Sequence, residues 1–294
     1  MDKSIIEILE DMKLPFPLSD IEITPFTSAE DGSEYSVWRV CCKDQKFVLK
    51  RAKGFEIETY SSFFSDGIAG APKFYTAVNY RGDDYFLMGY VDGVDLCKCT
   101  RESLKRTLDA IISLQNKYWE DKTYENCGFS FEKSIVGRIS RGKYLFDNEI
   151  ESAYALFLEE YRRLPRTLCH DDLLPFNVLV SDNGATLIDW EYGGILPYPT
   201  PIARLIAHCE EDENAFFYMS EDDKAFAIDY YYENLVRSKG ISYDEYRRSF
   251  DLFLLYEYCE WIMLGNKYDN GDKSMLEKYT KWAKALINKQ FIGT

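Results

Sequence analysis

Residues 167–190 read TLCHDDLLPFNVLVSDNGATLIDW, and this stretch decides how the chain is interpreted. It holds two short apolar runs, Asn177–Val180 and Ala185–Ile188, on either side of the turn sequence Ser-Asp-Asn-Gly at 181–184. Short apolar runs joined by such a turn are typical of a β-hairpin. We therefore expect a loop followed by a hairpin, set between segments that have helical spacing.

Polar side chains occupy this loop and hairpin at places where core packing does not require them. His170, Asp172 and Asn177 form the pattern H-x-D-x-x-x-x-N just before the first run, and Asp189 follows the second. We expect two carboxylates and a carboxamide to converge at one end of the hairpin. Such a set suits phosphoryl transfer, in which one carboxylate orients the proton of an attacking hydroxyl while an amide and a second carboxylate hold Mg²⁺.

The first third of the chain is rich in β-branched and aromatic residues with turn residues between them, which predicts one antiparallel sheet. The expected strands are Ile21–Thr27, Tyr35–Cys41, Lys46–Ala52, Lys73–Tyr80 and Tyr85–Val91. A single helix, Phe55–Phe64, interrupts these strands. An amphipathic turn or helix at the N-terminus places five apolar residues on one side, namely Ile5, Ile6, Ile8, Leu9 and Met12.

Helical spacing dominates after the turn sequence Val-Asp-Gly at 91–93, and Thr100 is suited to cap the first helix. The expected helices are Arg101–Tyr118, Tyr144–Arg163, Pro201–Cys209, Asp222–Lys239, Tyr243–Leu264 and Met275–Lys289. We therefore expect an α+β fold of two lobes. An antiparallel sheet lobe with one helix would cover residues 1–91, and a mainly helical lobe would cover residues 92–294.

The sequence HDDLLPFNVLV followed by LIDWEYGG resembles the aminoglycoside phosphotransferase and choline kinase family, whose members usually have H-G-D-x-x-x-x-N and a later I-D-[WF]-E. This resemblance implies a protein-kinase-like fold and an enzyme that transfers the γ-phosphate of ATP or GTP to an alcohol. It also implies that Asp172 is the catalytic base, that Asn177 and Asp189 are magnesium ligands, and that His170 braces the loop.

An expected strand ends in Phe-Val-Leu-Lys at 47–50, much like the kinase sequence V-A-I-K. By the resemblance, Lys50 holds the nucleotide α and β phosphates, and a glutamate of the following helix fixes its ammonium. We assign this role to Glu58, with Glu56 as the alternative because it would face elsewhere on the helix. Taken alone, a lysine at the end of a strand is more often a solvated surface residue.

Backbone groups at two further places are expected to meet the nucleotide. Segment 85–93, YFLMGYVDG, resembles the link between kinase lobes, where Gly89 and Val91 would contact the adenine edge; an edge strand leading into a turn would leave the same residues. The loop between the first two strands has one glycine instead of G-x-G-x-x-G. The phosphates would therefore meet backbone amides and the hydroxyls of Ser28 or Ser33.

Three features depart from the pattern of the family. The pair Glu30-Asp31 would repel a triphosphate unless both side chains point to solvent. Asp171 replaces a glycine, and we expect it to face solvent or substrate because a second buried carboxylate beside Asp172 would raise one of the two pKa values. Pro201 stands where an aspartate usually steadies the catalytic loop.

Acidic and aromatic residues of the helical lobe are candidates for binding the acceptor. Glu191 adjoins the expected metal site, and Glu257, Glu260 and Trp261 share a helix face. Carboxylates with aromatic rings suit a cationic acceptor such as an aminoglycoside, or an amino alcohol such as choline or ethanolamine. The ordinary alternative is an amphipathic helix with a solvated polar face. A third hypothesis is a binding or coat protein that keeps the fold with little turnover.

Charge and cysteine usage exclude several classes. Across 294 residues, 35 Lys and Arg face 50 Asp and Glu, a net charge of −15, which disfavours nucleic acid and anionic membranes as partners. Eight cysteines without C-x-x-C and two histidines away from metal-ligand spacing disfavour a disulfide scaffold and a zinc site. The chain has neither a secretory signal nor a long apolar run, so we expect it in the cytoplasm.

Overall fold

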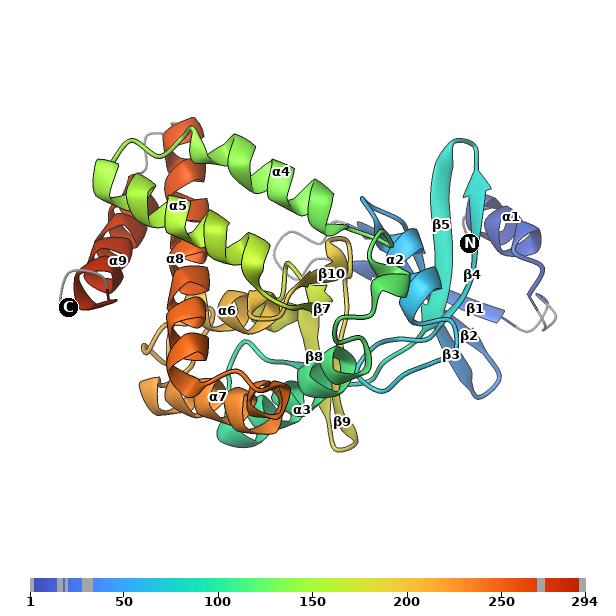
Figure 1. Ribbon diagram of the computed structural model, residues 1–294. Helices are drawn as coiled ribbons and strands as arrows, with labels where there is room; N and C mark the ends of the chain where they lie inside the picture. Colours follow the sequence, from blue (N-terminus) through green and yellow to red (C-terminus); the bar gives the residue numbers. More distant parts are fainter. Residues whose placement is uncertain (1–2, 15–17, 19–20, 28–33, 269–272, 291–294) are drawn as a thin grey trace.

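The computed structural model describes residues 3–14, 18, 21–27, 34–268 and 273–290. A five-stranded antiparallel sheet forms the N-terminal lobe, with strand order β1-β2-β3-β5-β4. Its strands are β1 (Ile21–Thr27), β2 (Glu34–Cys42), β3 (Gln45–Arg51), β4 (Phe74–Tyr80) and β5 (Asp83–Gly89). In Figure 1 this sheet lies at one end of the molecule and the helices gather at the other, so the predicted sheet lobe and helical part are confirmed.

Two helices cover opposite faces of the sheet. The alternation of side chains along β3 sends Phe47 and Leu49 to the outer face, where they pack in one apolar cluster with α1 (Lys3–Asp11). Val48 faces the other way, into the large core that also contains residues of α2 (Glu56–Phe63). Lys50 follows in the same alternation, so its side chain starts from the inner face of the sheet.

The helical part contains seven α-helices within the described residues. They are α3 (Arg101–Lys117), α4 (Phe131–Gly142), α5 (Asn148–Arg163), α6 (Thr200–Ala207), α7 (Glu221–Asn234), α8 (Tyr243–Lys267) and α9 (Ser274–Gln290). Helix α4 was not predicted. Helix α5 begins at Asn148, later than expected, because the Asp147 carboxylate accepts the amide protons of Glu149 and Ile150 and caps it there.

Two small sheets lie between the five-stranded sheet and the helices (Figure 1). The predicted hairpin is present as β8 (Val178–Ser181) and β9 (Gly184–Leu187), and β6 (Val94–Asp95) joins it at the β8 edge. Strands β7 (Arg166–His170) and β10 (Gly193–Pro197) form the other pair, which was not predicted. The loop that carries the polar motif runs from the end of β7 at His170 to the start of β8 at Val178.

One apolar core runs through both parts of the molecule. It joins Phe63 and Phe64 of the sheet lobe to Tyr118 and Trp190 of the helical part. The eight cysteines are all free, and no helix in the described ranges is long and apolar enough to span a membrane. A boundary between lobes at residue 91 stays a prediction, since the core does not divide there.

Candidate active site

The catalytic-loop motif is held in place by its histidine. His170 ends β7, is 1% exposed, and its Nε2 donates to the carbonyl of Ile188 over 2.8 Å. Its Nδ1 accepts the backbone N–H of Asp172 over 3.3 Å. This pair of bonds requires the neutral ring, and burial lowers the pKa of His170, which agrees with that state. His170 therefore links the loop before β8 to the residue that follows β9.

Asp172 and Asn177 form the two ends of the loop. The side-chain amide of Asn177 donates from Nδ2 to the backbone carbonyl of Asp172 over 2.9 Å, and this bond fixes the orientation of the amide. Asp172 Oδ1 accepts a hydrogen bond from Arg204 Nη2 over 2.7 Å. Asp172 still has 37% of its side-chain surface exposed, so it can meet a ligand.

Lys50 connects the sheet lobe to the end of the hairpin. Its ammonium lies 2.6 Å from Glu56 Oε1 and 2.6 Å from Asp189 Oδ1. Asp189 has φ +63, a left-handed backbone conformation that is uncommon for an aspartate and that occurs at functional sites. The structure thus brings Lys50 and Asp189 together across 139 positions of sequence.

Burial and mutual contact shift the pKa values of Lys50, Glu56 and Asp189. Burial alone lowers the pKa of Lys50, but the carboxylates of Glu56 and Asp189 outweigh burial and raise it. Burial raises the pKa of Asp189, but Lys50 outweighs it and lowers that pKa below its usual range. Glu56 is fully buried, and burial raises its pKa to about 7 in spite of Lys50. Lys50 and Asp189 are therefore both charged at neutral pH.

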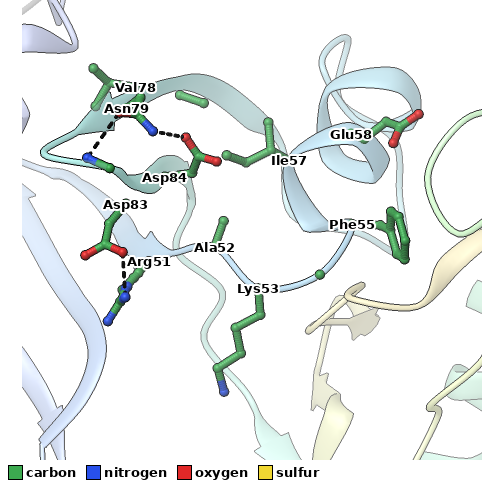
Figure 2. A pocket seen from close by; sticks show the side chains of 13 residues that line it. Arg51, Ala52, Lys53, Phe55, Ile57, Glu58, Val78, Asn79, Asp83 and Asp84 are labelled. Atoms are coloured by element: carbon green, nitrogen blue, oxygen red, sulfur yellow. Dashed lines mark hydrogen bonds and ion pairs between the residues drawn. The ribbon is translucent and has the colours of Figure 1, made fainter.

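The assignment of Glu58 as the partner of Lys50 is wrong. Glu56 contacts the ammonium, whereas Glu58 is exposed and lies 3.9 Å from Lys133. Figure 2 shows Glu58 on α2. Glu58 lines a hollow of about 650 Å³ on the sheet lobe, together with Arg51, Lys53 and residues of the 77–84 hairpin. None of Lys50, Asp172, Asn177 and Asp189 lines this hollow.

Two of the other predicted nucleotide contacts, Gly89 and Val91, lie at the end of β5 or just after it. Gly89 ends β5, and its amide donates to the Lys73 carbonyl over 2.8 Å, so this amide is already engaged. Val91 lies in the connection from β5 to β6 and stays a prediction. Ser28 and Ser33 lie outside the described residues, as do Glu30 and Asp31.

The expectation that Asp171 faces solvent is wrong, and the alternative that it faces substrate stays a prediction. Its carboxylate lies 2.6 Å from Arg138 Nη2, and Arg138 is 1% exposed. Arg138 lies between the rings of Tyr161 and Tyr256, at 4.6 and 4.5 Å from their centroids. Burial nevertheless raises the pKa of Asp171. A buried guanidinium from α4, which the sequence did not reveal, allows a second carboxylate beside Asp172.

The residues proposed for the acceptor are engaged with arginines. Glu257 is 2.8 Å from Arg204 Nη1, and Glu260 forms an ion pair with Arg141. Trp261 donates from Nε1 to His208 Nδ1 over 3.2 Å, and its ring stacks on Tyr279. These contacts do not leave the free carboxylates that a cage for a quaternary ammonium group would need.

Glu191 lies between the sheet lobe and the helical part. Its backbone carbonyl accepts the Phe55 amide over 3.3 Å, and its side chain packs over Gly54, which adopts φ +45. A Cβ at Gly54 would lie 2.7 Å from Glu191 Cγ, so the close approach requires a glycine. A role for Glu191 toward the acceptor stays a prediction.

Sequence reasoning missed two charged residues of this region, Arg138 and Arg204, and gave Glu56 only as the alternative to Glu58. Glu56 had a signal, because it lies four residues before the buried Tyr60 and shares its helix face. Arg138 and Arg204 gave no such signal, because the carboxylates that they contact in the catalytic loop lie 33 and 32 positions away in sequence.

The comparisons with known proteins concern the family and the fold. Residues 137–230 match the model of the phosphotransferase enzyme family. This segment contains Asp172, Asn177, Asp189 and Arg204, and the match confirms the predicted resemblance and the class of enzyme. No curated protein sequence matches the chain.

Solved structures of phosphotransferases share the fold over nearly the whole chain. A thermostable mutant of aminoglycoside phosphotransferase APH(4)-Ia, in ternary complex with ADP and hygromycin B, has a TM-score of 0.61 at 12% identity, with 100% of both chains covered. An aminoglycoside phosphotransferase from Alicyclobacillus acidocaldarius has a TM-score of 0.63 at 14% identity, covering 96% of this chain and 92% of that one. Choline kinase from Cryptosporidium parvum Iowa II has a TM-score of 0.61 at 15% identity, covering 97% of this chain and 96% of that one. At these identities the similarity concerns the fold.

Proposed function

We propose that this protein is a small-molecule kinase that transfers the γ-phosphoryl group of ATP or GTP to a hydroxyl of a small acceptor, such as an aminoglycoside-like compound. The observation that carries the proposal is the Lys50 ammonium at 2.6 Å from Asp189, next to a loop that presents Asp172 and Asn177. A lysine that bridges the lobes beside oxygen donors is suited to a nucleotide triphosphate. The nucleotide and hygromycin B bound by the APH(4)-Ia structure support this reading.

In the proposed reaction, Asp172 accepts the proton of the acceptor hydroxyl as that oxygen attacks the γ-phosphorus. The bond between the γ-phosphorus and its bridging oxygen breaks, and the nucleoside diphosphate leaves. Lys50 would hold the α and β phosphates, and Glu56 would hold Lys50. His170 keeps the loop in register through its bonds to Asp172 and Ile188.

The donor set of the site fits Mg²⁺. Asn177 uses its amide nitrogen for the Asp172 carbonyl, which leaves its side-chain oxygen as a donor, and Asp189 adds a carboxylate. The protein would thus supply two oxygen ligands, one from Asn177 and one from Asp189. Mg²⁺ usually completes its shell with water and phosphate oxygens, and when bound it neutralises phosphate charge.

Calorimetric titration with ATP and with GTP, each with Mg²⁺, tests the nucleotide site. Release of nucleoside diphosphate over a panel of aminoglycosides, amino alcohols, macrolides and sugars then identifies the acceptor. Replacement Asp172→Asn should reduce turnover about 10²- to 10⁴-fold, as loss of a general base does. If neither nucleotide binds, the proposal fails; if Asp172→Asn keeps full turnover, the role of Asp172 fails.

A further inference from the structure

Arg204 is the residue of α6 that reaches the catalytic loop. Its Nη2 donates to Asp172 Oδ1 over 2.7 Å, and its Nη1 donates to Glu257 Oε2 over 2.8 Å. The Arg204 side chain is only 13% exposed, whereas Asp172 keeps 37% of its side-chain surface. Arg204 therefore holds one carboxylate oxygen of Asp172, and the rest of the carboxylate remains accessible to a ligand.

The carboxylate that holds Arg204 belongs to the interior of the helical part. The Glu257 side chain is 2% exposed, and its Oε2 also lies 3.4 Å from His208 Nε2. Burial by itself raises the pKa of Glu257, but Arg204 outweighs burial and lowers it. Burial likewise disfavours the charge of Arg204, but Glu257, Glu260 and Asp172 outweigh it and raise its pKa. The buried pair thus stays ionised.

We propose, on the basis of the proposed function, that Arg204 is a positioning residue that fixes one oxygen of Asp172 so that the other faces the acceptor hydroxyl. Glu257 is the residue that keeps Arg204 in this orientation. These two assignments replace the interpretation of Glu257 as part of a site for a cationic acceptor.

The geometry requires a guanidinium. Two nitrogens of one planar group point at two carboxylates, and the compact ammonium of a lysine cannot reproduce this fork. Pro201, three residues earlier on α6, has no side-chain donor or acceptor, so it cannot make the polar contact to the loop that Arg204 makes. The same guanidinium also lies 3.7 Å from Glu260, so it lies within a cluster of acidic residues.

The test compares Arg204→Lys, Glu257→Gln and the double variant Arg204→Met/Glu257→Gln. The double variant removes both charges of the buried pair, because a lone Arg204→Met would leave Glu257 buried without a partner. We expect the double variant to lower kcat about 10²-fold, the usual cost of a misplaced catalytic group, while KM for the nucleotide changes less than about threefold. Arg204→Lys should recover part of that loss, and Glu257→Gln should lower kcat without changing nucleotide affinity.

Asp251→Asn is the matched control. Asp251 is also on α8, is 2% exposed, and pairs with an arginine, Arg247, at 3.3 Å. We expect its kcat to stay within about twofold of wild type although it also loses a buried ion pair. If the double variant keeps the wild-type kcat, or if its loss of kcat is matched by Asp251→Asn at equal loss of melting temperature, Arg204 has only a structural role.

Hydrogen exchange of the peptide that contains Asp172 gives a readout without turnover. A hydrogen bond to a charged group is worth enough to change local opening about tenfold, so exchange should be about tenfold faster in the double variant and unchanged in Asp251→Asn. Equal exchange in all three proteins would overturn the inference. Absence of nucleotide binding by the wild type would overturn the proposed function instead, and exchange would still decide the role of Arg204.

Discussion

Glu56 is a carboxylate whose pKa burial raises to about 7. It is fully buried, its Oε1 lies 2.6 Å from the Lys50 ammonium, and its Oε2 accepts the Lys53 amide over 3.0 Å. A hydrogen bond between charged groups contributes about 1.5–3 kcal/mol, and an unpaired buried partner costs more than the bond itself. Glu56 therefore helps to hold the Lys50 ammonium, together with Asp189.

Replacement Glu56→Gln should weaken nucleotide use, because the amide holds the Lys50 ammonium less firmly. We expect kcat/KM for the nucleotide to fall about 10- to 100-fold, which corresponds to about 1.4–2.7 kcal/mol. Glu58→Gln, two residues away on the exposed face, should stay within about twofold of wild type. Steady-state kinetics of both variants check this, and equal effects at the two positions would contradict it.

The neutral state of His170 predicts how stability depends on pH. Because burial lowers the pKa of His170 in the folded protein, the unfolded chain binds more protons between the folded value and about 6.5. The contribution of His170 to stability is therefore present above about pH 6.5 and declines as the pH falls below it.

His170→Gln removes this dependence. We expect the wild type to exceed the variant in free energy of unfolding at pH 8, and the difference to shrink by about 1.4 kcal/mol for each unit by which the folded-state pKa is lowered. Urea unfolding of both proteins at pH 8, 6 and 5 measures the difference. A difference that stays constant or grows toward pH 5 would show that the folded ring accepts a proton freely.

At the scale of elements, β10 approaches its neighbours more closely than any side chain would allow. A Cβ at Gly194 would lie 2.2 Å from the carbonyl oxygen and 2.8 Å from the carbonyl carbon of Phe129, both backbone atoms. Gly194 pairs with Cys169, one residue before His170, so this close packing supports the strand that carries the catalytic loop.

Gly194→Ala should therefore cost about 3 kcal/mol or more, because backbone must move to admit the methyl group. Gly137→Ala is the control, since nothing lies within 4 Å of a Cβ there and the residue is inside α4. It should raise the free energy of unfolding by up to about 1 kcal/mol through helix propensity. Chemical denaturation of the two variants measures whether the free energy of unfolding falls in Gly194→Ala and rises in Gly137→Ala. An unchanged free energy of unfolding in Gly194→Ala would refute the packing argument.

Most elements could be predicted from the sequence because their buried faces are apolar and regularly spaced. The five strands and the hairpin at 178–187 have such faces. Helix α4 escaped prediction because its buried face contains Ser134 and Arg138 as well as Phe131 and Ile135, so the apolar period is interrupted. Arg138 and Arg204 escaped prediction for a different reason. Their partners, Asp171 and Asp172, come close only after folding.

At the scale of the molecule, two acidic stretches of the helical part, residues 210–213 and 221–223, form local ion pairs. Glu210 pairs with Lys278, Glu221 with Lys224, and Asp223 with Arg101. Glu210 and Asp223 thus pair with other segments of the helical part, whereas Glu221 pairs within α7. The net charge of −15 is the excess of carboxylates over basic residues, and a nucleotide bound as proposed would depend on Lys50 and on Mg²⁺ for charge compensation.

The shared core joins the sheet lobe to the helical part through direct contacts. The Tyr118 hydroxyl donates to the Phe63 carbonyl over 3.0 Å, the Phe64 and Trp190 ring centroids lie 4.9 Å apart, and the Leu187 amide donates to the Gly70 carbonyl over 2.8 Å. Opening the lobes would expose these buried groups on both sides. The two parts should therefore unfold together.

We expect a single thermal transition with equal calorimetric and van't Hoff enthalpies near 200 kcal/mol, from about 0.7 kcal/mol per residue. A sheet lobe that unfolded alone would give about 60 kcal/mol in a separate transition. Tyr118→Ala, which removes both the hydrogen bond and the ring from the junction, should lower the van't Hoff enthalpy relative to the calorimetric one, whereas Tyr75→Ala on the exposed face of β4 should not. Two resolved transitions in the wild type would mean that the lobes are held by the Lys50 bridge and not by their common core.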